Sequence, residues 1–240
     1  MKKSKLLHLL VLAALAVPGL AIAEDSPFSG NVSLTSNYLY RGVSQTNDKA
    51  AIQGGFDYAH ASGFYAGAWG SSISWLVDGG YYNSSSLELD TYAGFKGGFA
   101  EDFTFDVGFL RYNYPGEYLP PQIAANTNEL YGAIGWKWLT AKYSRSMTNL
   151  FGVDNSSGSG YIDLSGSYTL EGPGVTLGAH YGKQTIANTT PSGDYTDYNV
   201  KASKDFSGFT LAVMLSKVKG STAGIYDEDT KGVLSVSRSM

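Results

Sequence analysis

Residue types that could carry out catalysis are scarce in this sequence. It contains no cysteine, which excludes disulfide bonds, thiolate metal sites and a cysteine nucleophile. Beyond residue 23 the only histidines are His60 and His180. Ser62 stands close to His60, but no carboxylate or amide lies near them in sequence to orient the imidazole, as a serine hydrolase site requires. We therefore assign no catalytic residue, and a lipid hydrolase is the least favoured class.

Two other motifs could hold an ion or a phosphate group. Asp227-Glu228-Asp229 offers carboxylate oxygens to a hard divalent cation, but it lacks the spacing of a cation-binding loop and is better explained as a solvated acidic segment. Residues 152–160 are rich in glycine and serine, yet no lysine or helical pattern follows them to complete a phosphate-binding loop. We predict no metal ligand, no cofactor-binding residue and no cofactor.

The composition excludes further classes of protein. Charged residues make up 16% of the chain, below the ~25% of an ordinary soluble domain, whereas aromatic residues reach 14% and glycine accounts for 30 of 240 positions. The net charge of -4 argues against a nucleic-acid partner, because phosphate binding depends on clustered lysine and arginine.

The amino terminus has the pattern of a secretion signal. Lysines at positions 2, 3 and 5 precede an apolar stretch over residues 6–16, and Ala21-Ile22-Ala23 supplies the small residues of a cleavage site. We predict a cleaved signal peptide over residues 1–23 and one mature domain over residues 24–240. The alternative, an uncleaved membrane anchor, would need a longer apolar run of about 20 residues.

Beyond residue 23, apolar and polar residues alternate with a period of two, which is typical of strands with one apolar face. Leu164 and Tyr168, for example, share one parity, and Asp163 and Ser165 hold the other. The pattern predicts twelve strands, at residues 28–41, 50–60, 64–75, 86–97, 103–114, 127–138, 139–146, 159–170, 175–184, 195–204, 209–218 and 231–240. A soluble β-sandwich would show the same alternation.

The connections between the strands favour a barrel over a sandwich, because short turns alternate with long polar loops. The fold class that we predict is all-β: a 12-stranded antiparallel up-and-down transmembrane β-barrel with short periplasmic turns and long extracellular loops. An even number of strands places both termini in the periplasm. Aromatic residues near the strand ends suit the headgroup layers of the cell outer membrane; they include Tyr38, Tyr40, Trp75 and Tyr181 on the loop side, and Tyr58, Trp136, Trp138 and Tyr168 on the turn side.

Four segments also resemble a known family. Residues 37–45 (NYLYRGVSQ), 63–69 (GFYAGAW), 89–94 (LDTYAG) and 112–116 (YNYPG) are similar to sequence blocks of the TorF family of proteobacterial porin-type proteins. The resemblance covers essentially the whole mature chain. It implies an outer-membrane barrel with pore activity, and it supplies no catalytic residues. Outer-membrane lipid and the barrel-assembly machinery are then expected partners.

Strand parity and direction assign a height to each inward side chain. The half of the lumen beside the long loops is predicted to be acidic, with Arg41 as its one cation, and the half beside the short turns is mixed or basic. The pore-lining residues that we predict are Arg41, Asp57, Glu88, Asp90, Tyr92, Lys96, Asp106, Tyr112, Glu129, Tyr131, Lys137, Lys142, Asp163, His180, Asp197 and Lys201. Neighbouring-strand ion pairs that stabilise the wall are an equally good explanation of these charges.

The function that follows is passive diffusion of small hydrophilic solutes or ions through an outer-membrane channel. The surplus of inward carboxylates predicts a weak preference for cations. The small inward residues of twelve strands predict a narrow lumen, and too few residues precede the first strand to plug it. The alternative is a closed structural or adhesion barrel that acts through its extracellular loops. The identity of the solute and the oligomeric state stay open.

Overall fold

The structure is a computed structural model, and it describes residues 26–240. The predicted signal peptide, residues 1–23, lies outside the described residues. Among residues 26–240, no helix has the length and apolar character needed to cross a membrane.

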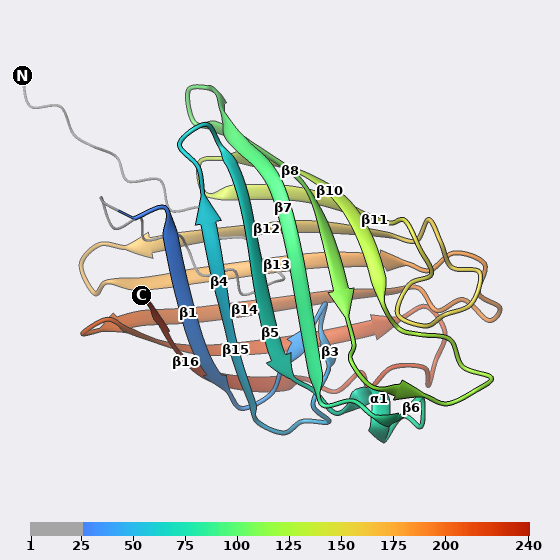
Figure 1. Cartoon of the computed structure of the whole chain (residues 1–240). Helices are drawn as coiled ribbons and strands as arrows, with labels where there is room; N and C mark the ends of the chain where they lie inside the picture. The colour runs from blue at the N-terminus through green and yellow to red at the C-terminus, as the bar shows by residue number, and fades with distance from the viewer. Residues whose placement is uncertain (1–25) are drawn as a thin grey trace, which may run out of the picture.

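Twelve antiparallel strands close into one barrel, which confirms the predicted fold class (Figure 1). Each strand pairs with its neighbour in the chain, and the first barrel strand closes the ring by pairing with the last. The barrel strands are β1 (Phe28–Thr35), β4 (Ala51–Ala59), β5 (Phe64–Ser72), β7 (Leu87–Ala100), β8 (Phe103–Asn113), β10 (Thr127–Trp136), β11 (Leu139–Ser146), β12 (Gly160–Leu170), β13 (Val175–Thr185), β14 (Tyr195–Phe206), β15 (Phe209–Gly220) and β16 (Lys231–Ser239).

The predicted alternation fixes which side chains face outward. Ile134, Leu164 and Val213 are 55%, 49% and 47% exposed, although each lies within a strand. Their neighbours of opposite parity, such as Asp163, are buried inside the barrel. A closed sheet satisfies its backbone hydrogen bonds internally, so an apolar outer face of this kind can lie in lipid.

Short turns form one rim of the barrel and long loops form the other (Figure 1). The carboxyl terminus and the start of β1 lie at the rim of short turns, where Gly30 and Met240 exchange backbone hydrogen bonds. At the other rim, the short helix α1 (Trp75–Asp78) and a small sheet of β6 (Tyr82–Ser84) and β9 (Glu117–Tyr118) cover part of the opening.

The predicted strand over residues 28–41 is wrong in its second half. β1 ends at Thr35, and the chain then folds into a hairpin of β2 (Leu39–Tyr40) and β3 (Val43–Ser44). Arg41 and Gly42 form its two-residue turn, with φ of 47° and 79°. Positive φ at both central positions is the geometry that joins antiparallel strands tightly. Figure 1 shows β3 inside the ring of barrel strands. We call residues 37–45 the lumenal hairpin.

The position of the lumenal hairpin also corrects part of the predicted aromatic rim. Tyr38 and Tyr40 are each 7% exposed and lie inside the barrel rather than in the headgroup layer. Trp75 belongs to α1 and packs against Tyr114. Of the other predicted rim residues, Tyr181, Trp136, Trp138 and Tyr168 are exposed on the outer surface, and their position in a headgroup layer stays a prediction.

Candidate functional site: a lumen closed by its own hairpin

The lumenal hairpin crosses the barrel and is held at its tip by Arg41. The guanidinium lies 2.8 Å from Glu129 Oε2 on β10, and its other terminal nitrogen donates to Gln184 Oε1 on β13 at 2.7 Å. It also stacks over the ring of Tyr161, 4.2 Å from the centroid. Because Arg41 and Glu129 are both almost fully buried, this pair is screened little by water. The prediction that Arg41 lines the wall of the pore is therefore wrong. Arg41 lies at the tip of the hairpin and joins the hairpin to the wall.

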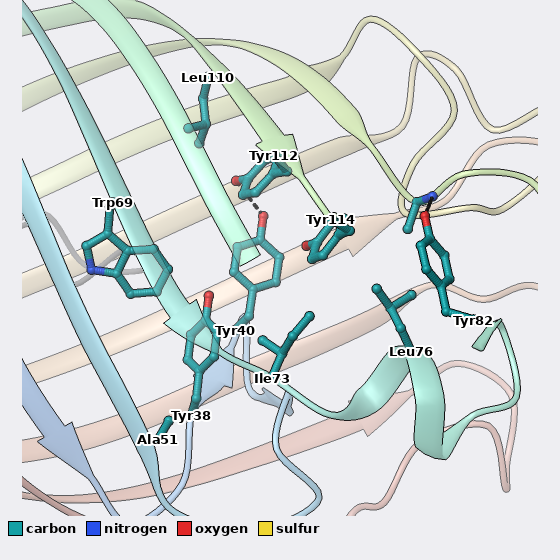
Figure 2. Packing of buried hydrophobic residues seen from close by; sticks show 11 residues of the cluster. Tyr38, Tyr40, Ala51, Trp69, Ile73, Leu76, Tyr82, Leu110, Tyr112 and Tyr114 are labelled. Carbon is teal, nitrogen blue, oxygen red and sulfur yellow. Dashed lines mark hydrogen bonds between the residues drawn. The ribbon is translucent and has the colours of Figure 1, made fainter. Parts of the chain in front are cut away.

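Two tyrosines fix the sides of the hairpin to the opposite part of the wall. The Tyr38 hydroxyl donates to Glu88 on β7 at 2.9 Å, and the hydroxyls of Tyr40 and Tyr112 are 2.7 Å apart. Figure 2 shows this contact between Tyr40 and Tyr112 within a cluster of inward aromatic rings. Phe151, from the loop after β11, packs on the rings of both tyrosines.

The tip of the hairpin also touches the wall through Gly42. A Cβ at this position would lie 2.6 Å from Val218 Cγ2 on β15 and 2.7 Å from Asp197 Cβ on β14. Both distances are below a normal carbon–carbon contact, so the wall and the hairpin backbone meet directly. Together with the contacts of Arg41, Tyr38 and Tyr40, these contacts join the hairpin to β7, β8, β10, β12, β13, β14 and β15.

At the level of the hairpin the lumen is filled. Every barrel strand contributes an inward side chain, in the half near the long loops, that is at most 8% exposed. They are Thr35, Gln53, Ser71, Glu88, Tyr112, Glu129, Ser144, Asp163, Gln184, Asp197, Val218 and Val233. A continuous water-filled passage would expose part of this ring. We call the half of the lumen beside the long loops the upper lumen. In this conformation the hairpin therefore closes the upper lumen.

His180 lies between two carboxylates on the β12–β14 side of the upper lumen. Its Nε2 is 2.8 Å from Asp197 Oδ1, and its Nδ1 is 3.1 Å from Asp163 Oδ2. The second contact has an ion-pair distance but not the angle of a hydrogen bond. The Tyr161 hydroxyl completes the group by donating to Asp197 at 2.9 Å. An imidazolium at this place would neutralise one of the two carboxylates and contact both.

Glu88 and Asp90 have no such cation. They stand two residues apart on the inner face of β7, and both are 0% exposed. One oxygen of Glu88 accepts from Tyr38, but the other and both oxygens of Asp90 have no hydrogen-bond partner. Among residues 26–240, no group of three or more histidine or acidic side chains is arranged to hold a metal ion.

The half of the lumen beside the short turns, the lower lumen, is less tightly packed. Lys96 and Lys142 lie over the rings of Tyr65 and Tyr131, with Nζ 5.2 Å and 4.0 Å from the centroids. Lys201 is exposed within the barrel. Within residues 26–240, none of these three lysines has a carboxylate within ion-pair distance, so they leave positive charge facing the lower lumen.

Tyrosine hydroxyls pair with the acidic groups of the lower lumen. Tyr92 donates to Asp57, and Tyr65 donates to Asp106, each at 2.6 Å. Tyr131 contacts the hydroxyl of Tyr65 and so extends this network. Their contacts place Asp57, Tyr92, Asp106 and Tyr131 inside the barrel. That these four residues line a pore stays a prediction, and Tyr65 was not predicted.

Lys137 does not face the lumen, contrary to the prediction. β10 ends at Trp136, and Lys137 stands in the two-residue turn to β11 with a φ of 54°. Its ammonium group is half exposed and lies 3.6 Å from Asp102 in the adjacent turn. The period-two pattern misplaced Lys137 because a tight turn interrupts the alternation without any change in composition.

Sequence reasoning missed Tyr38, Gln184 and Gly42 as members of the site. Gln184 shares its parity with His180, so its inward position could have been predicted. The Arg41-Gly42 pair is a turn signal of the hairpin type, since glycine readily adopts positive φ. Tyr38 and Tyr40 alternate with Asn37 and Leu39 as in a continuous strand, and the turn signal was therefore overlooked.

Solved structures with a similar fold include a porin. The chain is 12% identical to the KdgM porin in complex with disordered oligogalacturonate, with a TM-score of 0.54 over 89% of this chain and 98% of that chain. A structure from work on the in-meso crystallization of membrane proteins gives 8% identity and a TM-score of 0.50 over 89% and 83% of the two chains. OprD of Pseudomonas aeruginosa gives 15% identity and a TM-score of 0.46 over 91% and 68%. The likeness to the KdgM porin shows a porin-like barrel fold.

None of the curated proteins compared with this sequence matches it. The family that matches does not carry the TorF name suggested by the sequence blocks, although the porin-like barrel implied by that resemblance is present. The match extends over residues 22–231, and the chain therefore belongs to the family described as a bacterial protein of unknown function, Gcw_chp.

Proposed function

We propose that this protein is a passive, non-enzymatic channel of the outer membrane for small hydrophilic solutes or ions, with the lumenal hairpin as its constriction. The observation that carries the proposal is a closed barrel with an apolar outer face and polar inward side chains from every strand. Lipid contacts the outer face, and the solute passes on the inner face. The short turns and both termini then lie in the periplasm.

The constriction follows from the contacts of the hairpin. Its polar anchors to the wall are the Arg41–Glu129 ion pair, the hydrogen bond from Arg41 to Gln184 and two tyrosine hydroxyl contacts, and the peptide backbone of the hairpin is not part of the barrel sheet. It can therefore leave the wall without breaking any hydrogen bond between barrel strands. Passage of a solute then requires displacement of the hairpin tip from Glu129 and Gln184.

Single-channel recording in a planar bilayer tests this function. Wild-type protein should give small or brief conductance steps, and a variant with residues 38–45 replaced by two glycines should give larger and longer ones. Shortening the loop between β15 and β16 by the same number of residues is the matched control, because that loop does not cross the lumen. Silence from all three proteins, each shown to be folded by its heat-dependent gel mobility, would contradict the channel.

The runner-up function is a closed structural or adhesion barrel that acts through its long loops. The complete ring of buried side chains in the upper lumen favours it. The two functions differ in the recording described above. A structural barrel would stay silent in wild-type form and conduct only after the hairpin is removed.

A weak preference for cations belongs to the same proposal. In the upper lumen Arg41 is engaged by Glu129, and His180 by Asp163 and Asp197, whereas Glu88 and Asp90 have no cationic partner among residues 26–240. Unpaired carboxylates at a constriction attract cations. The preference should sharpen at low salt, because the Debye length grows from ~8 Å at physiological ionic strength to ~30 Å at 0.01 M.

Reversal potentials in a salt gradient test the preference. Replacing Glu88 by glutamine and Asp90 by asparagine should shift the reversal potential of the conducting protein toward anions. Changing Lys96 to methionine should shift it the other way. A wild-type channel that prefers anions would contradict this part of the proposal and leave the channel itself intact.

A further inference from the structure

The outer face of the barrel strands carries basic side chains and no acidic ones. Every carboxylate within the twelve barrel strands has inward parity: Asp57, Glu88, Asp90, Asp106, Glu129, Asp163, Asp197 and Asp205. Basic side chains of outward parity gather near the long-loop ends of four strands. They are Arg111 on β8, Arg145 on β11, Lys183 on β13, and Lys217 and Lys219 on β15. We call these residues the basic belt.

The register of the sheet holds the basic belt at one level. Each member lies within three residues of the last residue of its strand, at the end beside the long loops. Thr196 on β14 pairs with Lys183 on one side and with Lys219 on the other, so a single strand separates these two lysines. The belt strands alternate with β10, β12 and β14 around this side of the barrel (Figure 1). Because neighbouring strands lie about 4.8 Å apart, positive charges follow one another roughly every 10 Å.

A layer of tyrosine rings lies directly below the basic belt. Tyr143 and Tyr181 stand two residues before Arg145 and Lys183 on the same outward parity, and they are 48% and 46% exposed. On a barrel that spans a membrane, such rings lie in the headgroup layer. The basic belt stands one step farther from the hydrocarbon, at the level where lipid phosphate groups lie.

The protein supplies no partner for these charges. Within residues 26–240, no member of the basic belt has a carboxylate at ion-pair distance or an aromatic ring under its charge. The outward bases at the short-turn end differ in this respect. Lys204 lies over the ring of Phe206 at 5.4 Å, and Arg238 lies over the ring of Phe209 at 5.0 Å. The unpaired outward charges therefore belong to one end and one side of the barrel.

Arg111 is held in place on the outer face before any ligand binds. Its Nε donates to Asn113 Oδ1 at 2.7 Å, and its Nη1 donates to Asn128 Oδ1 at 3.0 Å. Both partners are neutral amides, so the positive charge of the guanidinium is not compensated. The planar N–H groups of arginine match the oxygens of a phosphate, and a side chain that is already oriented loses less entropy when it binds.

We propose that the basic belt binds a lipid whose headgroup carries anionic phosphate groups, from the leaflet that surrounds the long loops. The acyl chains would lie on the apolar face below the belt, where Ile162 and Leu215 are 46% and 52% exposed. Charge complementarity selects this occupant, because the outer face has basic groups to attract a phosphate and no carboxylate to repel it. The stems of lysine and arginine lie along apolar surface while their charges reach the headgroups. The inference requires a barrel in a membrane and does not depend on conductance.

Lipid binding in detergent micelles tests the basic belt. The folded protein is titrated in a nonionic detergent with lipid A, whose headgroup carries anionic phosphates, or with phosphatidylcholine, whose phosphate is balanced by a choline cation. Native mass spectrometry counts the bound lipid. The wild type should bind lipid A at least about tenfold more tightly than phosphatidylcholine, and added salt should weaken the binding of lipid A. Equal affinity for the two lipids would overturn the proposal.

Inorganic phosphate distinguishes a lipid site from a site for the free ion. Phosphate at the concentration of lipid A should not displace the lipid, because the ion lacks acyl chains that contact the apolar face. Displacement at that concentration would overturn the assignment to a lipid.

Substitutions locate the binding on the basic belt. A variant that combines four changes should bind lipid A at least about tenfold more weakly than the wild type; the changes are Arg111→Gln, Arg145→Gln, Lys183→Gln and Lys219→Gln. The matched control is Lys204→Gln with Arg238→Gln, which removes the outward bases of the short-turn end and should change the affinity less than about twofold. Equal losses in the two variants would show that the belt is not the site.

Folding of each variant is checked by its heat-dependent gel mobility. If the fourfold variant does not fold, Lys183→Gln with Lys219→Gln replaces it, because both lysines are exposed. This pair should weaken the binding of lipid A by at least about threefold. Undiminished binding in the pair would overturn the proposal. Silence in single-channel recordings would contradict the channel and leave the lipid site intact.

Discussion

The two halves of the lumen have inward residues of the same types but use them differently. In the upper lumen, tyrosines and charged groups are buried against the lumenal hairpin, and Tyr112, Glu129 and Asp163 are at most 2% exposed. In the lower lumen, the lysines at positions 96, 142 and 201 have no carboxylate within ion-pair distance among the described residues, and they face a more open space. The difference arises from one loop, because the twelve strands run through both halves.

This comparison separates structural charges from charges that a solute would meet. A buried ion pair contributes little net stability, but removal of one partner leaves the other uncompensated. A solvated charge can be removed at small cost, because water already stabilises it. Charge changes should therefore be costly in the upper lumen and mild in the lower lumen.

The largest effect is expected where the upper lumen loses a partner of Arg41. Glu129→Leu leaves the buried guanidinium without its carboxylate and should lower the free energy of unfolding by about 3–5 kcal/mol. Lys201→Met, in the lower lumen, should change it by less than about 0.5 kcal/mol. Urea titrations of both variants in lipid vesicles measure the difference. Equal losses would mean that the two halves do not differ in burial.

Trypsin cleavage provides a second measurement on Glu129→Leu, because it reports release of the hairpin from the wall. Trypsin cuts after arginine, and Arg41 is 5% exposed in the wild type. In Glu129→Leu, cleavage after Arg41 should become at least tenfold faster if the hairpin leaves the wall. Resistance to trypsin would show that Tyr38 and Tyr40 hold the hairpin without the ion pair.

A smaller effect is expected at the outer face, which tests the position of the barrel in lipid. Leu164→Arg places a charge on the exposed apolar face of β12 and should cost about 2–4 kcal/mol near the bilayer midplane. Ser167→Arg, on the inner face of the same strand in the lower lumen, is the control and should fold normally. Ser165 is unsuitable as the control, because it is buried and pairs with His180. Equal destabilisation at 164 and 167 would contradict the predicted parity.

The outer face and the lower lumen are the parts that the sequence predicts well. Lipid contact imposes a period of two on each strand, so local alternation was enough to locate Leu164, Ile134 and Val213 on the outside. Eleven of the twelve strands lie at the predicted places with ends shifted by a few residues, whereas the first strand ends at Thr35, six residues early. The lumenal hairpin could not be predicted in the same way. Its position depends on contacts between residues as distant in sequence as Arg41 and Gln184.

The structure buries Glu88, Glu129 and Asp163 inside the barrel, but their partners were not predictable, and that they line a pore stays a prediction. Strand parity gave the height of Glu88, Glu129 and Asp163 and left open whether they are paired. The pairing depends on where Arg41 and the His180 ring lie in three dimensions. The alternation of apolar and polar residues continues through Tyr40, and the prediction therefore extended the first strand too far. A hairpin whose residues keep the parity of the preceding strand has the same sequence pattern as a longer strand.

Packing of the hairpin tip against the wall predicts a moderate effect at Gly42. Gly42→Ala must relieve contacts of 2.6 Å and 2.7 Å with Val218 and Asp197, and it also places alanine at a φ of 79°. Gly208→Ala is the matched control, since its φ is 83° and nothing lies within 4 Å of its Cβ. Both variants have the same backbone strain. Gly42→Ala should lower the free energy of unfolding by about 1–3 kcal/mol more than Gly208→Ala, because its Cβ overpacks the site. Equal losses in urea titrations would place the hairpin tip away from the wall.

The smallest effect concerns the ion contacts that join the base of the hairpin to the last loop. Lys231 Nζ lies 2.6 Å from Asp48 and 2.5 Å from Asp227, while Asp48 also accepts from Asn37 of the hairpin. The hydrogen bond from Lys231 holds the pKa of Asp227 below its ordinary value. A carboxyl group whose pKa is lower in the folded protein contributes stability above its unfolded pKa of about 3.9 and loses it as the pH falls through the folded value.

Asp227→Asn should therefore reduce stability by less than about 1 kcal/mol at pH 7, because the carboxylate is exposed and screened. The deficit should shrink as the pH falls from about 4 toward the lower folded pKa of Asp227, because the unfolded chain is protonated first. Melting temperatures of both proteins between pH 3 and pH 7, at low and high salt, measure it. Asp205→Asn, near the end of β14, is the control for a general loss of negative charge. A deficit that persists at pH 3, or that ignores salt, would show that Asp227 acts through loop geometry rather than through its charge.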